Sequence, residues 1–588
     1  MSRKVQWGVA LILVAMLGLE LGSAAQESQT WDEAVHLSAG VSYWQTGDFR
    51  MNPEHPPLLK LWSALPLVLA GVRAPIDDPS WAAVDEWQFG DVFLYENEWS
   101  PQQLLLLGRL PVMLLSLLLG AMIFKVSRQW FGTTAGFVSL CLYAFDPSII
   151  AHSRYVTTDL AFALATFFTL LRLLTVLERP TRRNTFLFGL AILLAGLTKF
   201  SGAALVASIA GVLILKKFLT PRSPALEWRN VWRFTVVFIP LAWLTIWMVY
   251  AFDMRSPDQD PRIAKLESER EAIVQSTPPA ELTGLQRFAV VTLGDTSHGI
   301  GAWLDRMKHG TYPTYTFFRG LTAVVSHATG GHGSFLLGEH RDTGWWWYFP
   351  FTMLAKTPIP TMVAWIGAIV LAWLAWRLRR RSGQTTWTML RTLDTRWLVF
   401  LGVPLAFMTI AMMGKLNLGW RHVMPIYPPL IVLAGSVVTI AGRAFGWRRW
   451  VIPGLIIGNI VFVEAGTYPN QIGYFSPAVG GNHNGPNVLQ DSNLDWGQDL
   501  PKLQAYVNDQ GLVELPFAYY GRARVTDYVP QAIQLPKDNE VMSSGRPRGT
   551  VAISVGQLFD PSAGYRWLWP FQPVKRLGSS ILVYQLPD

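Results

Sequence analysis

Charged residues are scarce in this sequence of 588 residues, because Asp, Glu, Lys and Arg together make up only 15% of it. A soluble globular protein carries about 25%. Hydrophobic residues make up 51%, and many of them fall in long apolar runs. Such runs are typical of membrane-spanning helices, so the composition excludes a soluble protein and indicates an integral membrane protein.

Cysteine is almost absent as well. The one cysteine, Cys141, lies in an apolar run and can form no disulfide within the chain. Segments outside the membrane must therefore fold without such a cross-link. We expect Cys141 to pack in a hydrophobic core.

Several common catalytic and binding motifs are also missing. The sequence contains no phosphate-binding loop, no nucleophile elbow and no HExxH zinc motif. It has no aromatic-basic pattern of the kind that binds nucleic acid, so no nucleic-acid partner is expected. The net charge of +9 is explained instead by the basic loops of one membrane face.

Eleven apolar stretches predict transmembrane helices, and the basic residues between them predict the orientation. Every second connecting segment is rich in Lys and Arg, which places those segments in the cytoplasm. The N-terminus is then inside and the C-terminus outside. The predicted spans are 5–22, 104–124, 134–150, 157–177, 185–198, 202–218, 233–252, 357–376, 397–413, 423–441 and 450–465.

The first span has a second interpretation. Arg3 and Lys4, the apolar run and the sequence Ser23-Ala24-Ala25 also resemble a cleavable signal peptide. Cleavage would remove about the first 25 residues. In either case, residue 26 onward lies outside.

The predicted fold class is an α-helical polytopic membrane protein with external loops and a small external α/β domain. Residues 1–465 form the transmembrane domain, with external loops 23–103 and 253–356. Residues 466–588 form the external domain, because they contain no span and combine a helical stretch with strand-like runs. Those elements are predicted at 500–508, 551–555 and 581–586. Two further helices are predicted in the loops, an interfacial one at 58–72 and a charged one at 262–275.

Charged residues gather at the outer ends of these spans, against the usual distribution. Asp32 and Glu33 follow the first span, and Asp159 opens the fourth. Asp159 fits either an acid that stabilises a helix N-terminus or a functional group such as a metal ligand. The outer cations are Lys60, Arg154, Lys199, Lys356, Lys415 and Arg421. Each alone would fit an interface anchor, whereas six on one face fit the binding of an anionic headgroup.

The first loop combines acid, base and proline residues. Asp32 and Glu33 are adjacent, and His55 and Lys60 follow in a proline-stiffened segment. This set is suited to deprotonating a hydroxyl beside an anionic lipid. The spans hold few ionisable residues at mid-depth, since Glu20 and Arg172 lie close to span ends. Because ion-coupled transporters need such residues, the pattern favours chemistry at the surface.

These motifs resemble those of the GT-C membrane glycosyltransferases, and in pattern most of all the bacterial branch of the protein O-mannosyltransferase and aminoarabinose transferase group. The resemblance extends over nearly the whole chain. The pieces that carry it are Trp31-Asp32-Glu33, His55-Pro56-Pro57-Leu58 with Lys60, Ala151-His152-Ser153-Arg154, Thr157-Thr158-Asp159, Leu197-Thr198-Lys199-Phe200-Ser201-Gly202, Tyr348-Phe349-Pro350, Lys356-Thr357-Pro358, Asn417-Leu418-Gly419-Trp420-Arg421-His422 and the segment from Asp491 to Asp499.

The resemblance implies an inverting sugar transfer from a polyprenyl-phosphate donor on the outer face of the bacterial inner membrane. The acceptor would be a lipid, a glycan or a protein. The family's acid pair corresponds to Asp32 and Glu33, and its second acid to Asp159. The cations that hold the donor phosphate would be Lys60, Arg154, Lys199, Lys356 and Arg421. A divalent metal (Mg, Mn or Zn) would be held by Glu33 and Asp159, and His55 and His422 are further candidates for substrate or metal contacts.

Within this interpretation, Asp32 is the predicted general base. Glu33 would point elsewhere if the segment is extended, because neighbouring residues then alternate faces. Two other functions stay open. A flippase or transporter of lipid-linked sugars would require intramembrane acids, and a non-catalytic membrane scaffold would not require the outer cluster of charges. The sequence identifies neither the sugar nor the acceptor.

Overall fold

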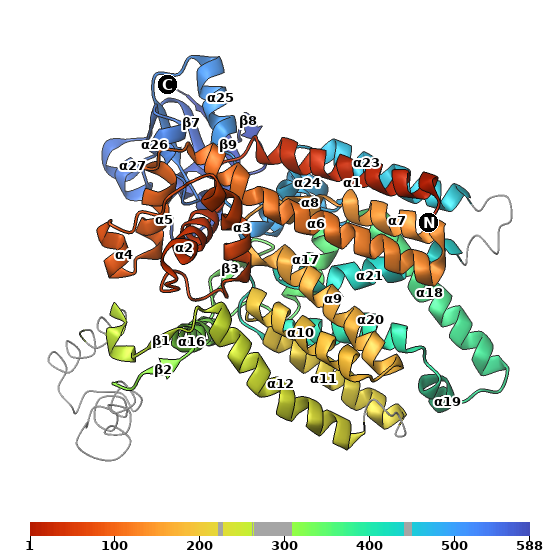
Figure 1. Ribbon diagram of the computed structural model, residues 1–588. Coiled ribbons are helices and arrows are strands. Elements are labelled where there is room, and N and C mark those ends of the chain that lie inside the picture. Colours follow the sequence, from red (N-terminus) through yellow and green to blue (C-terminus); the bar gives the residue numbers. More distant parts are fainter. Residues whose placement is uncertain (221–226, 262, 264–267, 269–308, 440–449, 588) are drawn as a thin grey trace, which may run out of the picture.

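Helices dominate the protein (Figure 1). The computed structural model describes residues 1–220, 227–261, 263, 268, 309–439 and 450–587. Long helices lie side by side, and the C-terminal sheet and the helices of the first loop gather at one end of them. The N-terminus and the short helix α19 (Thr386–Arg391) lie toward the opposite end.

Seven helical segments of the described chain are long and apolar enough to cross a membrane. They are α1 (Arg3–Ala24), α6 (Pro101–Phe131), α9 (Thr158–Glu178), α11 (Gly202–Leu219), α18 (Ile359–Arg381), α20 (Thr395–Met413) and Trp420–Thr439. The pair α7 (Thr133–Ala144) and α8 (Pro147–Ser153), bent by 63°, makes an eighth span if its two helices are counted as one. The chain is therefore a multi-pass membrane protein.

Each of the eleven predicted spans falls on helical structure. Three of them fall on helices that are not among the seven segments long and apolar enough to cross a membrane. These are α10 (Arg182–Thr198), α12 (Trp228–Val249) and α23 (Val451–Thr467). Cys141 is buried in α7, as expected. The bend that follows α7 is stabilised by Asp146, whose carboxylate accepts hydrogen bonds from the first backbone N–H groups of α8.

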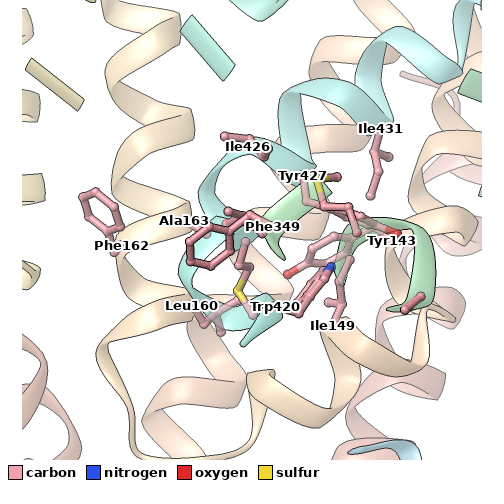
Figure 2. Packing of buried hydrophobic residues seen from close by; sticks show 14 of the residues in the cluster. Tyr143, Ile149, Leu160, Phe162, Ala163, Phe349, Trp420, Ile426, Tyr427 and Ile431 are labelled. Atoms are coloured by element: carbon pink, nitrogen blue, oxygen red, sulfur yellow. The ribbon is translucent and has the colours of Figure 1, made fainter. Parts of the chain in front are cut away.

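Large buried side chains hold the segment that follows α20. The 3₁₀-helix η4 (Trp420–Ile426) continues into α21 (Tyr427–Ala434) and places Trp420 and Tyr427 in the main hydrophobic core. Figure 2 shows these rings gathered with Tyr143, Ile149 and Phe349. The ring centroids of Trp420 and Tyr427 lie 5.1 Å apart. Because both rings are fully buried, the backbone around Arg421 has little freedom to shift.

The predicted first external loop folds into four helices, and their buried side chains form one hydrophobic cluster with residues of α6 and α10. The helix predicted at 58–72 is present as α3 and ends three residues earlier than expected. Helix α2 packs closely on it, since a Cβ atom added at Gly40 would lie 2.3 Å from the backbone oxygen of Lys60. The four helices are α2 (Glu33–Thr46), α3 (Leu58–Leu69), α4 (Pro79–Ala83) and α5 (Glu86–Tyr95).

The second external loop is described only in part. The helix predicted at 262–275 lies outside the described residues except for positions 263 and 268. Strand β1 (Met254–Arg255) pairs with β2 (Tyr312–Pro313), and β3 (Ser334–Leu336) pairs with β4 (Glu339–Arg341), both antiparallel. Two helices complete the segment, α16 (Tyr315–Gly330) and α17 (Tyr348–Lys356).

The C-terminal segment contains the predicted α/β elements. Helix α25 (Leu500–Gln510) covers the predicted helical stretch. A five-stranded sheet follows in the order β6-β5-β7-β9-β8, in which β5 runs parallel to β6 and β7 while β9 runs antiparallel to β7 and β8. The strands are β5 (Leu515–Ala518), β6 (Ala532–Gln534), β7 (Gly549–Ser554), β8 (Lys575–Leu577) and β9 (Ile581–Leu586).

The close approach of α2 and α3 leads to a test of this packing. Gly40→Ala should lower the free energy of unfolding by about 1–3 kcal/mol, because the added methyl group would force the two helices apart. Gly18→Ala in α1 is the matched control, since a Cβ atom there would meet nothing within 4 Å. Thermal unfolding of both purified variants in detergent provides the measurement. A Gly40→Ala protein as stable as Gly18→Ala would contradict the packing described here.

Candidate active site

A buried ion pair holds the start of the first loop. Arg109 of α6 and Glu33 of α2 are each 1% exposed or less and form two hydrogen bonds, Nε to Oε1 at 2.8 Å and Nη2 to Oε2 at 2.6 Å. Arg109 also donates to the backbone oxygens of Ala24 and Ser28. Burial alone would raise the pKa of Glu33, but the charge and hydrogen bonds of Arg109 outweigh it and hold this pKa below its ordinary value. The pair therefore fixes the loop next to Asp32.

Arg154 belongs to a second buried pair. Its guanidinium donates to Glu27 Oε2 at 2.8 Å and to Glu27 Oε1 at 2.6 Å, and the side chain is 0% exposed. The ring of Tyr155 lies beside the guanidinium groups of both Arg154 and Arg109. Because Arg154 is enclosed and bidentately paired, the structure does not offer it to a phosphate at the surface.

Lys60 and Lys356 are each held by oxygen atoms of the protein. Lys60 Nζ donates to Tyr43 Oη and to the backbone oxygen and Oδ1 of Asn52. Lys356 Nζ donates to the backbone oxygens of three residues of the C-terminal segment, Ile472, Tyr474 and Asn493. Both ammonium groups are fully buried, so Lys356 ties the C-terminal segment to α17 instead of facing an open site.

Four other charged side chains converge from four separate elements. Asp32 directly precedes α2, Asp159 lies in the first turn of α9, Lys199 follows the last residue of α10, and Arg421 lies in η4. Lys199 Nζ lies 2.5 Å from Asp159 Oδ1. Arg421 Nη1 lies 3.1 Å from Asp32 Oδ2 and 3.5 Å from Asp159 Oδ2. We call these four residues the charge cluster.

The charge cluster is open to solvent on the side of Asp32. The side chain of Asp32 is 21% exposed, that of Arg421 13% and that of Asp159 only 1%. The C-terminal segment packs against the cluster. Its buried Trp496 ring has its centroid 4.4 Å from the guanidinium of Arg421. Asp491 is a further acid near the cluster. Burial raises the pKa of Asp491, and the positive charge of Arg421 opposes this rise.

Three histidines adjoin the charge cluster. His36 Nδ1 donates to the backbone oxygen of Val156 at 2.6 Å, and its ring lies 5.1 Å from that of His55. Burial, together with His36 and Lys199, lowers the pKa of His55 well below its ordinary value, so this ring is neutral near pH 7. The third, His422, directly follows Arg421. The structure thus brings His55 and His422 to the same place as Asp32, Asp159, Lys199 and Arg421.

Several buried polar atoms of this site have no hydrogen-bond partner among the described residues. They include Arg421 Nε, His422 Nε2 and Asp159 Oδ2. Most buried polar groups in proteins are hydrogen-bonded, so a group of unsatisfied atoms at one place indicates that a polar ligand binds there. Arg421 Nε is a donor and lies near the ammonium of Lys199, so an anion suits this position, whereas Asp159 Oδ2 can only accept a hydrogen bond.

The metal site expected from Glu33 and Asp159 does not fit this arrangement. Both oxygens of Glu33 bond to Arg109, and Asp159 is paired with Lys199. Within the described part of the chain, no group of three or more His, Cys, Asp or Glu side chains is placed to hold a metal ion. Cations occupy the positions around these carboxylates that a metal ion would need.

Arg109 and Glu27 are the two important partners that sequence reasoning missed. Arg109 lies inside the predicted span 104–124, which was treated as part of a bundle with few internal charges. An arginine within an apolar run usually has a buried acidic partner, and this signal was present in the sequence. Glu27 offers no such signal, because it lies just beyond the first predicted span, 5–22, where an acidic residue is ordinary.

A family model matches the part of the chain that contains several of these residues. Residues 105–250 match the family described as dolichyl-phosphate-mannose-protein mannosyltransferase. This match confirms the resemblance to membrane glycosyltransferases and indicates a glycosyltransferase. It includes Asp159 and Lys199, whereas Asp32 and Arg421 lie outside it. No curated protein matches the chain.

Solved structures of membrane enzymes are similar to the chain at low identity. One is ArnT from Cupriavidus metallidurans in the apo state, with 14% identity, a TM-score of 0.44 and coverage of 99% of this chain and 98% of that chain. The same protein bound to undecaprenyl phosphate has 12% identity and a TM-score of 0.44, with coverage of 98% and 97%. The archaeal oligosaccharyltransferase AglB from Archaeoglobus fulgidus, in complex with an inhibitory peptide and a dolichol-phosphate, has 11% identity and a TM-score of 0.45, with coverage of 97% and 73%. At this level of similarity, no activity follows for the present chain.

The pair between Glu33 and Arg109 leads to a stability test. Its contribution is fully present above the unfolded pKa of glutamate, about 4.3, and is lost as the pH falls through the lower pKa of the folded state. Glu33→Gln should therefore lower the free energy of unfolding at pH 7 by about 3–5 kcal/mol, because Arg109 loses its counter-charge in a buried site. The difference from wild type should shrink below about pH 4.

Denaturant unfolding in detergent at pH 7 and at acidic pH measures this effect, and Glu98→Gln on the exposed part of the same loop is the control. A Glu33→Gln protein that is as stable as wild type at pH 7 would show that the pair does not hold the loop.

Proposed function

We propose that this protein transfers a sugar from a polyprenyl-phosphate donor to an acceptor hydroxyl at the membrane face that holds the charge cluster. The observation that carries the proposal is the buried N–H of Arg421 Nε, which has no partner among the described residues and lies in the same cluster as Lys199, with the unpartnered ring nitrogen His422 Nε2 on the next residue. The match of residues 105–250 to a glycosyltransferase family supports the same reaction class.

Arg421 and Lys199 hold the donor phosphate in this proposal. Without a ligand, their charges are balanced by Asp32 and Asp159. The donor phosphodiester carries one negative charge shared by its two non-bridging oxygens, which compete for these cations, and a guanidinium binds such a pair of oxygens in a bidentate manner. As the bond to the sugar breaks, negative charge grows on the phosphate, and the same two cations stabilise it.

Asp32 accepts the proton of the acceptor hydroxyl. It is the most exposed acid of the charge cluster, so it is the carboxylate that an acceptor can reach. The hydroxyl oxygen attacks the anomeric carbon while the bond from that carbon to the phosphate oxygen breaks, and the polyprenyl phosphate leaves. A single displacement of this kind inverts the anomeric configuration. When the phosphate draws Arg421 away from Asp32, the carboxylate becomes a stronger base.

The remaining predicted site residues have supporting roles in this scheme. Glu33 and Arg154 hold the loop and the segment before α9 through buried ion pairs, and Lys60 and Lys356 bind backbone oxygens. His55 adjoins the charge cluster as a neutral ring and is a candidate contact for the substrate. No step of the scheme passes through a metal ion.

The location that fits this proposal is the bacterial inner membrane, with the charge cluster and the C-terminal segment on the periplasmic side. The basic ends of α11 and α18, with Lys216, Lys217 and Arg379–Arg381, lie toward the end of the molecule opposite to the C-terminal sheet (Figure 1). Basic residues favour the cytoplasmic side, which supports this orientation. The acceptor would be a lipid, a glycan or a protein.

The role of the base is tested by Asp32→Asn, which preserves size and hydrogen bonding but removes the proton acceptor. We expect the rate of sugar transfer to fall about 10²–10⁴-fold. Purified protein is assayed with undecaprenyl-phosphate-linked hexoses and pentoses and a membrane extract as the acceptor source. Asp77→Asn, at an exposed position of the same loop, is the control. If Asp32→Asn transfers sugar at the wild-type rate, another group must be the base.

Donor binding is tested by Arg421→Gln and Lys199→Gln. Each should weaken the binding of undecaprenyl phosphate by about 2 kcal/mol or more, close to 30-fold in Kd, because a buried charge contact to phosphate is lost. Native mass spectrometry in detergent measures this affinity. Arg341→Gln, at an outer-face arginine that is half exposed, should bind the lipid as wild type does. Unchanged affinity in both cluster variants would place the phosphate elsewhere.

A further inference from the structure

Three aromatic rings form a partly exposed surface beside Asp32. Trp31 directly precedes Asp32, Trp87 lies on α5, and Tyr520 follows β5 of the C-terminal sheet. The ring centroids of Trp31 and Tyr520 lie 5.1 Å apart, with an interplanar angle of 40°. The guanidinium of Arg522 lies 5.6 Å from the Trp31 ring centroid and 4.3 Å from the Trp87 ring centroid. We call Trp31, Trp87, Tyr520 and Arg522 the aromatic ledge.

The first loop and the C-terminal segment build the ledge together. Figure 1 shows α2 and α5 next to the C-terminal sheet, and Ser28 joins the two parts by donating to the backbone oxygens of Gln498 and Gly497. Arg524 adds a contact to Glu96 at 2.9 Å. Because these contacts come from both sides, the ledge has a defined position relative to Asp32.

Tyr520 is supported from behind by a glycine. A Cβ atom added at Gly556 would lie 2.5 Å from Cγ of the Tyr520 ring and 2.8 Å from two further ring atoms. Gly556 is itself held by a hydrogen bond from its N–H to Asp495 Oδ2 at 2.9 Å. The absence of a side chain at position 556 therefore lets the ring lie against the backbone while it remains partly exposed.

Several carboxylates lie near Tyr520. Burial raises the pKa of Tyr520 well above its ordinary value, and Asp491 and Asp32 are among the acids that raise it further. Tyr520 thus stays a neutral hydrogen-bond donor, and the acids beside it are acceptors. The ledge combines ring faces for an apolar surface with acceptors for hydroxyl groups.

This combination matches one class of acceptor. A pyranose ring presents C–H groups on its faces, which pack against aromatic rings, and hydroxyl groups around its edge, which can donate to carboxylates and accept from Tyr520 and Arg522. We propose that the aromatic ledge binds a sugar ring of a saccharide acceptor and directs one of its hydroxyl groups to Asp32. The proposal rests on the proposed function and specifies its acceptor as a saccharide.

Saturation-transfer NMR on the full-length protein in nanodiscs tests this binding without any need for turnover. The probes are the methyl glycosides of glucose, mannose, galactose and N-acetylglucosamine, with an acetylated threonine peptide amide as the competing class. We expect transfer to the ring C–H protons of at least one glycoside and none to the peptide. Transfer to the peptide alone, or to no glycoside, would overturn the proposal.

Variants locate the binding site. Trp31→Ala and Tyr520→Ala should each reduce the glycoside signal about fivefold, the loss expected from one stacked ring. Gly556→Ala keeps the tyrosine but displaces its ring, and it should reduce the signal in the same way. Trp569→Ala is the matched control, because this tryptophan is 55% exposed elsewhere in the C-terminal segment. Thermal unfolding confirms that each variant is folded, and an undiminished signal in all three folded ledge variants would overturn the proposal.

A competition experiment distinguishes the acceptor from the donor's own sugar. Saturating undecaprenyl-phosphate-linked mannose or glucose should leave the glycoside signal in place. If either donor abolishes it, the ledge holds the donor sugar and the acceptor assignment is wrong. The NMR signal does not depend on catalysis. Transfer at the wild-type rate by Asp32→Asn therefore contradicts the proposed function, whereas the absence of glycoside binding contradicts the proposal for the ledge.

Discussion

The buried pair of Arg109 and Glu33 is the interaction on which the arrangement of the site depends. It joins α6 to the start of α2, and the same two side chains bind the backbone of residues 24, 28, 30 and 156. A buried charge that loses its partner is strongly destabilising, so the pair holds the start of the loop against α6. The residue directly before Glu33, Asp32, is held in place as a consequence.

The charge cluster is balanced before any substrate arrives. Two carboxylates face two cations: Lys199 lies 2.5 Å from Asp159, and Arg421 lies 3.1 Å from Asp32 and 3.5 Å from Asp159. The tightest pair, between Lys199 and Asp159, anchors the cluster, while Arg421 makes the longer contacts and is the cation that an incoming anion engages in the proposed reaction. In the proposed reaction, donor binding and the activation of the base are therefore parts of one exchange of partners.

The C-terminal segment takes part in the site as well as covering it. Trp496 stacks on Arg421, the Asn493 side chain accepts a hydrogen bond from the backbone N–H of Trp420, and Tyr520 meets Trp31. Lys356 of α17 donates hydrogen bonds to three backbone oxygens of this segment. The chemical groups of the proposed site thus come from both the membrane helices and the residues after the last span, so neither part forms it alone.

Local properties of the sequence were sufficient to predict the apolar helical segments, the α/β character of the C-terminal segment and the presence of acids and cations at one end of the helices, because hydropathy and periodicity act over a few residues. Which charges meet was decided only by the tertiary structure. Asp32 and Glu33 are neighbours in sequence, yet one faces Arg421, 389 positions away, and the other faces Arg109. Arg154 and Lys356 looked the same as Arg421 and Lys199 from their positions at span ends, but buried partners enclose them. Ion pairing depends on long-range packing and burial, and no local pattern encodes these.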